Sequence, residues 1–118
     1  MQALSIEEKT REMMVYGYVA LKQFPKHETH VMGAEIRRSM LTLQRLIITA
    51  FKRYHKKTTL TDMDIELTML KRMIRTAKDM RYLDIKKYKL WSEKLIEIGK
   101  MLGGWIKSVK IPPKAAAL

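Results

Sequence analysis

Apolar residues recur at intervals of three and four along most of the chain, which is the spacing of one buried helical face. The longest run lies near the C-terminal end and contains Trp91, Leu95, Ile98, Leu102, Trp105 and Val109. Three earlier runs contain Ile6, Met13, Gly17, Ala20 and Phe24; Ile36, Met40, Leu43, Ile47, Ala50 and Tyr54; and Met63, Leu67, Leu70, Ile74 and Ala77. The pattern predicts four amphipathic helices that close around one core.

A proline-containing turn separates the first two predicted helices. The first begins at Ser5, which has capping-box spacing with Glu8, and it ends at Phe24 because a proline follows. A turn over residues 25–29 comes next. The second helix extends from this turn to about Tyr54.

Capping residues also mark the starts of the last two predicted helices. Residues 55–60 interrupt the apolar pattern, and Thr61 with Asp64 then repeats the capping-box spacing. Asp84 is placed to cap the fourth helix, which extends to about Lys110.

The lengths of these segments predict the architecture. Helices of about 20 to 27 residues are roughly 30 to 40 Å long, and short connections place neighbouring helices antiparallel. A chain of 118 residues holds one ordinary domain. We therefore expect an all-α, antiparallel up-down-up-down four-helix bundle over residues 1–110 and a tail over residues 111–118. Within the tail, residues 115–118 resemble a remnant of a cloning vector.

Net charge limits the possible functions of the chain more than overall composition does. The chain carries a formal charge of +12, and its isoelectric point of about 10.0 favours a polyanionic partner. Residues 1–35 contain four Lys or Arg and five Asp or Glu, whereas residues 36–118 contain twenty and seven. Nucleic acid is the first expectation and an anionic membrane the second. No apolar run is long enough to span a bilayer and no signal peptide is evident, so we expect a soluble cytoplasmic protein.

Basic side chains form stripes on the second and third predicted helices. Arg38, Arg45 and Lys52 fall on one line opposite the apolar face of the second helix. Lys71, Arg75 and Lys78 share one side of the third. The alternative is an ordinary solvated face. On such a face acidic residues usually lie among the basic ones, but none occurs between residues 37 and 57. The candidate residues for binding nucleic acid or a nucleic-acid enzyme are Arg37, Arg38, Arg45, Lys52, Arg53, Lys56, Lys57, Lys71, Arg72, Arg75 and Lys78.

The expected chemistry of these stripes is phosphate binding with release of counterions. Such binding is independent of sequence and weakens with salt. We predict no reading of bases, because the chain has no helix-turn-helix spacing, zinc finger or aromatic RNA-binding motif.

Some residues do not fit a simple bundle core. Leu41 and Ile48 lie about 100° or more from the centre of their helix's apolar stripe, so they pack at a bundle seam or form an oligomer or partner interface. Gly99 and Gly103 lie inside the fourth predicted helix, where each glycine costs about 1 kcal/mol relative to alanine. Close approach of another helix, within the bundle or between subunits, would offset that cost.

The sequence offers no recognisable catalytic or metal-binding set. It contains no cysteine, which excludes thiolate ligands and a cysteine nucleophile. His27 and His30 have helical spacing but no third ligand nearby, and no nucleophile elbow or phosphate-binding loop can be assembled. We predict a protein that is not an enzyme and uses no cofactor or metal.

Several segments resemble one group of bacterial helical proteins. Phe24-Pro-Lys-His-Glu-Thr-His-Val-Met-Gly33, followed by Ile36-Arg-Arg38, resembles the "four helix bundle protein" superfamily, which includes proteins encoded in intervening sequences of ribosomal RNA genes. The stretches Leu60–Arg72 and Tyr88–Lys110 are most similar to one branch of it, the accessory variability determinant (Avd) proteins of diversity-generating retroelements.

The resemblance implies a specific assembly and specific partners. Avd proteins form barrel-shaped homopentamers that bind the retroelement's reverse transcriptase, associate with RNA and DNA, and support cDNA synthesis during mutagenic retrohoming. No short partner-binding motif is carried over, so the site residues remain those of the basic stripes. Two rival functions stay open: a stand-alone RNA-binding protein of the ribosomal intervening-sequence type, and a structural oligomer that binds only protein.

Overall fold

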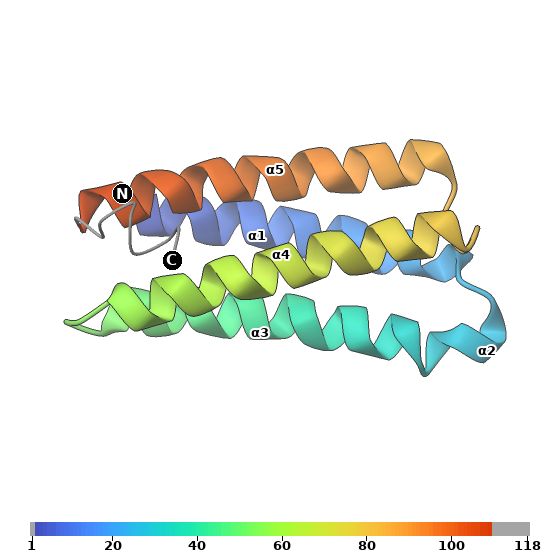
Figure 1. Cartoon of the computed structure of the whole chain (residues 1–118), viewed down its shortest axis with the longest axis horizontal. Coiled ribbons are helices and arrows are strands. Elements are labelled where there is room, and N and C mark those ends of the chain that lie inside the picture. The colour runs from blue at the N-terminus through green and yellow to red at the C-terminus, as the bar shows by residue number, and fades with distance from the viewer. Residues whose placement is uncertain (1, 110–118) are drawn as a thin grey trace.

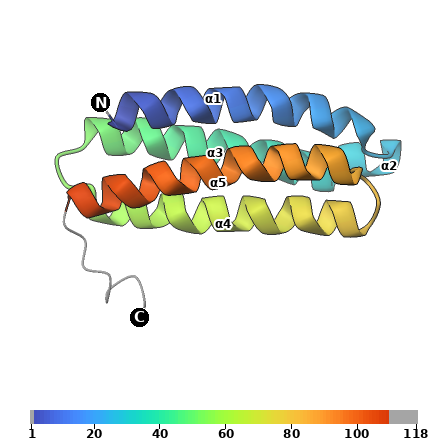
Figure 2. The same ribbon diagram turned by 90° about the horizontal axis from the view of Figure 1, so that it is seen from above.

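A computed structural model describes residues 2–109, with side chains from Ser5 onwards, and all of its regular structure is helical. The helices run nearly side by side along the length of the molecule (Figures 1 and 2). The described residues contain no strand, which agrees with the predicted all-α fold of four long helices. In chain order the elements are α1 Gln2–Ala20, the 3-10 turn η1 Leu21–Gln23, α2 Lys26–Thr29, α3 Met32–Lys52, α4 Lys57–Asp79 and α5 Ile85–Ser108.

Each long helix packs against two others. α3 contacts α1 and α4, and α5 also contacts α1 and α4, so successive long helices are neighbours and the last closes onto the first. The seam between α1 and α3 and the seam between α4 and α5 therefore lie on opposite sides of the bundle. The short α2 lies at the end of the bundle where α4 turns into α5 (Figure 1).

The predicted apolar faces form the core. Trp91, Leu95, Ile98, Leu102 and Trp105 of α5 are buried, as are the residues predicted for the other three runs, with one exception. The exception is Tyr54, which is 91% exposed because α3 ends at Lys52 and Tyr54 falls in the connection. Val109 is only partly buried. The core also contains Leu60 and Leu83, which lie at an end of α4 and in the α4–α5 turn.

Gly17 makes room for the largest core side chain. A Cβ atom at this position would lie 2.7 Å from the Trp91 ring and 2.8 Å from the Met40 sulfur. Trp91 is fully buried, and its indole N–H points at the sulfur of Met13 at 3.4 Å. This close contact places Gly17 of α1 level with Met40 of α3 and so defines the register between the two helices.

The predicted capping box at the first helix is wrong. α1 begins at Gln2, so Ser5 lies inside the helix and cannot serve as its N-cap. The residues before Ser5 include an alanine and a leucine, which favour helix and extend it. Glu8 instead pairs with Arg11 one turn later, at 2.9 Å.

The capping box predicted at Thr61 and Asp64 is also wrong. α4 begins four residues earlier, at Lys57, and the Thr61 hydroxyl donates a hydrogen bond to the Lys57 carbonyl at 3.0 Å. The early start places Leu60 in the core, where it is fully buried. In the short connection, the Lys56 ammonium group donates hydrogen bonds to the carbonyls of Ala50 and Arg53 at the end of α3.

The turn predicted over residues 25–29 is partly helical. Lys26–Thr29 form the short α2, and the long helix begins only at Met32. The predicted end of the last helix at Lys110, the tail at residues 111–118 and the vector-like residues 115–118 lie outside the described part of the chain.

Candidate nucleic-acid interface

A groove between α4 and α5 gathers several of the predicted basic residues. It has a volume of about 190 Å³ and no carboxylate in its wall. Arg72 and Arg75 are exposed and make no salt bridge with any described side chain, so both guanidinium groups are available to a ligand. The lining residues are Lys71, Arg72 and Arg75 from α4 and Tyr88, Ser92 and Ile96 from α5.

Lys71 enters this groove over a glycine of the neighbouring helix. A Cβ atom at Gly99 would lie 3.4 Å from the Lys71 ammonium nitrogen and 3.6 Å from Leu67. Gly99 therefore faces α4, as expected of a glycine at a close helix–helix contact. Gly103 does not: it is exposed, and no atom lies within 4 Å of its hypothetical Cβ. Packing within the protomer explains the first glycine and leaves the second unexplained.

Lys78 contacts Tyr88, which lines this groove. The Lys78 ammonium nitrogen lies 5.0 Å from the centre of the Tyr88 ring, within the range of a cation–π contact. Lys78 also pairs with Asp79 at 3.1 Å. It is consequently less available to an external anion than Arg72 or Arg75.

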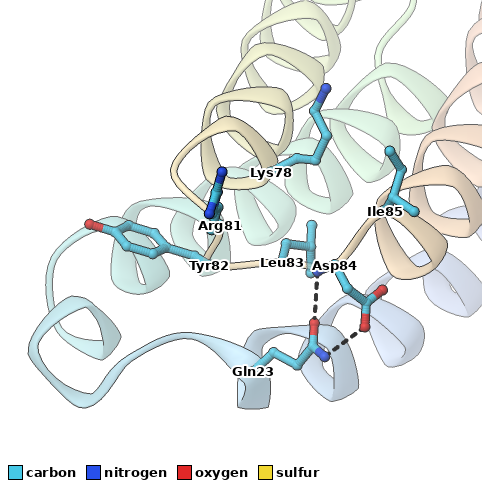
Figure 3. A pocket seen from close by; sticks show the side chains of 7 residues that line it. All are labelled: Gln23, Lys78, Arg81, Tyr82, Leu83, Asp84 and Ile85. Atoms are coloured by element: carbon cyan, nitrogen blue, oxygen red, sulfur yellow. Dashed lines mark hydrogen bonds between the residues drawn. The ribbon is translucent and has the colours of Figure 1, made fainter.

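Beyond Lys78, the turn between α4 and α5 forms a second hollow of about 420 Å³. Its walls include Lys78 from the end of α4, Arg81, Tyr82 and Asp84 from the turn, and Gln23 from η1 (Figure 3). In this view the nitrogen ends of Lys78 and Arg81 lie on the side of the turn away from Gln23.

Arg81 has a backbone conformation that usually belongs to glycine. Its φ angle is 65°, and the hydrogen bonds from Arg81 N–H to the Lys78 carbonyl and from Tyr82 N–H to the Ala77 carbonyl are those of a Schellman motif. A residue with a Cβ atom pays about 1 kcal/mol for this conformation. The Arg81 guanidinium is exposed and has no hydrogen-bond or ionic partner among the described side chains. The Schellman hydrogen bonds stabilise this backbone conformation, and no contact of the Arg81 side chain adds to them.

Asp84 anchors the same turn, as predicted. Its carboxylate accepts a hydrogen bond of 2.7 Å from the Lys87 backbone N–H and so caps α5. The Gln23 amide donates to this carboxylate at 2.7 Å and accepts from the Asp84 N–H at 3.1 Å (Figure 3). The bonds from Lys87 and Gln23 lower the pKa of Asp84 below its ordinary value. This arrangement ties η1 to the start of α5.

The predicted stripe on α3 lies elsewhere on the bundle. Arg38, Arg45 and Lys52 are exposed on the outer side of α3, away from the α4–α5 groove. Arg38 is within 3.5 Å of Glu35, and it shares a hollow between α3 and α4 with the carboxylates of Glu35 and Glu66. The two basic stripes are therefore separate, and the one on α3 includes acidic neighbours.

Other predicted site residues have roles inside the fold. Arg37 is partly buried and donates a hydrogen bond of 2.7 Å to the Thr29 carbonyl, which ties α2 to α3. Lys56 holds the connection between α3 and α4, as described above. Arg53 and Lys57 are exposed at the same end of the bundle, far along α4 from Arg75.

The opposite side of the bundle carries an exposed apolar surface. Leu41 is 47% exposed and Ile48 is 43% exposed, and both lie on the other side of α3 from Ser39, which donates a hydrogen bond to Glu66 of α4. Val15 and Tyr18 of α1 are also exposed, and the register set by Gly17 and Met40 puts them level with Leu41. We call these four residues the α1–α3 apolar face. They do not fill the protomer's own seam, which leaves them free to contact a partner.

Tyr88, Ser92 and Ile96 line the groove but are not among the site residues predicted from the sequence. Their spacing of four places them on one side of a helix, which is a visible signal. However, the spacing does not tell which neighbouring helix that side faces. Only the packing of α5 on α4 brings them to the basic residues.

The described residues provide little for other chemistries. No cluster of three or more histidine, aspartate or glutamate side chains is placed to hold a metal ion within the described part of the chain. Of the helices described, none is apolar over enough of its length to cross a bilayer. The predicted absence of metal and enzymatic activity stays a prediction.

Comparison with known proteins supports the resemblance seen in the sequence. No curated protein matches the chain. A family model described as bAvd-like matches residues 4–109, which cover all four long helices except the first two residues of α1. The chain therefore belongs to the bAvd-like family.

Proposed function

We propose that this protein is the non-catalytic accessory factor of a diversity-generating retroelement. It binds the retroelement's reverse transcriptase and its template RNA or cDNA, and so supports cDNA synthesis during mutagenic retrohoming. Membership of the bAvd-like family supports the association with a reverse transcriptase. The net charge of +12 supports the association with nucleic acid.

One observation carries the nucleic-acid part of the proposal. The α4–α5 groove brings Lys71, Arg72 and Arg75 together without a carboxylate in its wall. Phosphate oxygens are the ligands that such a set of cations binds best. The α3 stripe is a weaker candidate, because Glu35 and Glu66 line the hollow beside Arg38.

We also propose that the protein assembles with copies of itself through the α1–α3 apolar face. An exposed cluster of large apolar side chains is typical of a protein–protein interface. A homopentamer is the assembly implied by the family, and its mass would be about five times 13.9 kDa. Light scattering coupled to size-exclusion chromatography measures that mass directly.

Co-purification tests the proposed partner. A tagged copy of the chain is expressed with the reverse transcriptase encoded beside it, and the complex is washed at about 50 mM and about 200 mM salt. We expect a complex that survives purification after nuclease treatment. Absence of the reverse transcriptase from the eluate, together with RNA in a parallel eluate without nuclease treatment, would favour the stand-alone RNA-binding alternative. Absence of both would favour the structural oligomer.

A further inference from the structure

The two hollows along α4 and α5 form one path over the surface. Tyr88 lines the groove beside Lys71, and Lys78 lines the hollow in the turn. Because the Lys78 ammonium group lies over the Tyr88 ring, this pair stands between the two hollows. From Ile96 to Ile85 the path follows twelve residues of α5, a rise of about 16 Å.

The path combines cations with two exposed isoleucines and the half-buried ring of Tyr88. Ile85 is 67% exposed and Ile96 is 48% exposed. Phosphate binding alone does not require exposed apolar side chains. Bases in a duplex are stacked on both faces, so such side chains reach a base only where the strand is single. Basic grooves that contain aromatic side chains are typical of proteins that bind single strands without sequence preference.

The conformation of Arg81 is an independent observation at the end of the same path. A glycine would fit its φ of 65° without strain, yet the position carries a long cation that has no partner among the described side chains. A strained residue whose side chain makes no internal contact points to a function outside the fold. A phosphate that follows the path past Lys78 would reach this guanidinium.

We propose that the α4–α5 path binds one extended single strand of RNA or DNA. The phosphates lie along Lys71, Arg72, Arg75 and Arg81. An unstacked base takes the place of the Lys78 ammonium group on the Tyr88 ring, beside Ile96. This inference rests on the proposed nucleic-acid function and specifies its ligand as a single strand in place of a duplex.

Fluorescence anisotropy with the full chain tests the inference. The probes are a labelled 15-nucleotide strand and the same strand annealed to its complement, each titrated at about 50 mM salt. We expect the single strand to bind at least tenfold more tightly than the duplex. Equal affinities would overturn the inference and leave the proposed function standing, whereas no binding to either probe would overturn both.

Tyrosine variants test the base contact. Tyr88→Leu removes the ring and is expected to lower single-strand affinity by roughly 5- to 100-fold, with little change for the duplex. Tyr88→Phe keeps the ring and should bind normally. Tyr54→Leu is the matched control, because Tyr54 is an exposed tyrosine at the other end of the bundle. Equal losses for the strand and the duplex in Tyr88→Leu would contradict stacking.

Arg81→Gly separates binding from folding. Glycine relieves the backbone strain, so the variant should unfold at a higher temperature while its single-strand affinity falls by about three- to tenfold. A protein that has become more stable cannot lose affinity by unfolding. Unchanged affinity would remove Arg81 from the path.

Discussion

The two seams on opposite sides of the bundle differ sharply in their chemistry. The α1–α3 apolar face presents Leu41 and Ile48, whereas the α4–α5 path presents Lys71, Arg72 and Arg75. Both seams cover the same core, and the periodicity that forms the core is alike on all four helices. The difference therefore lies in the positions that flank each buried stripe. Those positions determine what the bundle can bind, and the core determines only that a bundle forms.

The largest effect is expected where charge is placed on the apolar face. The double variant Leu41→Glu, Ile48→Glu would bury two carboxylates in the proposed self-association interface, at a cost of several kcal/mol. We expect a folded monomer of about 13.9 kDa by light scattering, with an unchanged circular dichroism spectrum. An assembly of unchanged mass would show that this face is not the contact between copies.

Next in size is the effect of a carboxylate inserted beside Lys71. Gly99→Glu should pair with the Lys71 ammonium group and compete with phosphate, and we expect affinity for an RNA strand to fall about tenfold. Gly103→Glu makes the same change in net charge one turn further along α5, where no atom lies within 4 Å of an added Cβ. It should cost only about twofold. Equal losses in anisotropy titrations would mean that only net charge matters.

A smaller effect is expected on stability where the basic path ends. Asp84→Ala removes the N-cap of α5 and the bond to Gln23, so the midpoint of thermal unfolding should fall by a few degrees at about pH 7.

The pH dependence of this loss has a definite sign. The folded state lowers the pKa of Asp84, so its contribution is complete above the ordinary value of 3.8 and is lost as pH falls through the lower, folded value. The difference between wild type and Asp84→Ala should therefore shrink at about pH 2.5. A difference that grows on acidification would contradict the assigned hydrogen bonds.

The smallest effect is expected at Gly103, a helical glycine that no packing contact within the protomer requires. Gly103→Ala should raise the free energy of unfolding by about 0.5 to 1 kcal/mol, because alanine favours helix and its Cβ meets open space. Binding of an RNA strand should not change. Urea denaturation measures the first quantity, and a loss of stability would mean that another chain packs closely on Gly103 in solution.

The core was predictable from sequence and two helix starts were not. Periodicity identifies a buried face because the helix repeats every 3.6 residues, and this holds for Trp91 and its neighbours on α5. The helix starts predicted at Ser5 and Thr61 were wrong because a capping-box spacing also occurs inside helices. Burial of Tyr54 was wrongly predicted because the chain leaves the helix just before this residue. Lys56 donates a hydrogen bond to a carbonyl in the last turn of α3.

The candidate site was predictable only in part, and for a different reason. Lys71 and Arg75 stand out by their spacing on one helix, but so do Arg38 and Arg45 on another. From sequence alone the two stripes are equally good candidates for the binding site, because the sequence does not reveal the order of the helices around the bundle. The fold distinguishes them, because it places Tyr88 of α5 beside the first and acidic residues beside the second.

The salt dependence of RNA binding tests the α4–α5 interface most directly. Two triple variants remove the same charge: Lys71, Arg72 and Arg75 changed to glutamine in one, and Arg38, Arg45 and Lys52 in the other. Each phosphate contact to a single strand contributes about 0.7 to the slope of log affinity against log salt, so the α4 variant should lose about 2 units of slope. The α3 variant should lose about 0.5 or less. A larger loss of slope in the α3 variant than in the α4 variant would contradict the account and move the interface to the outer side of α3.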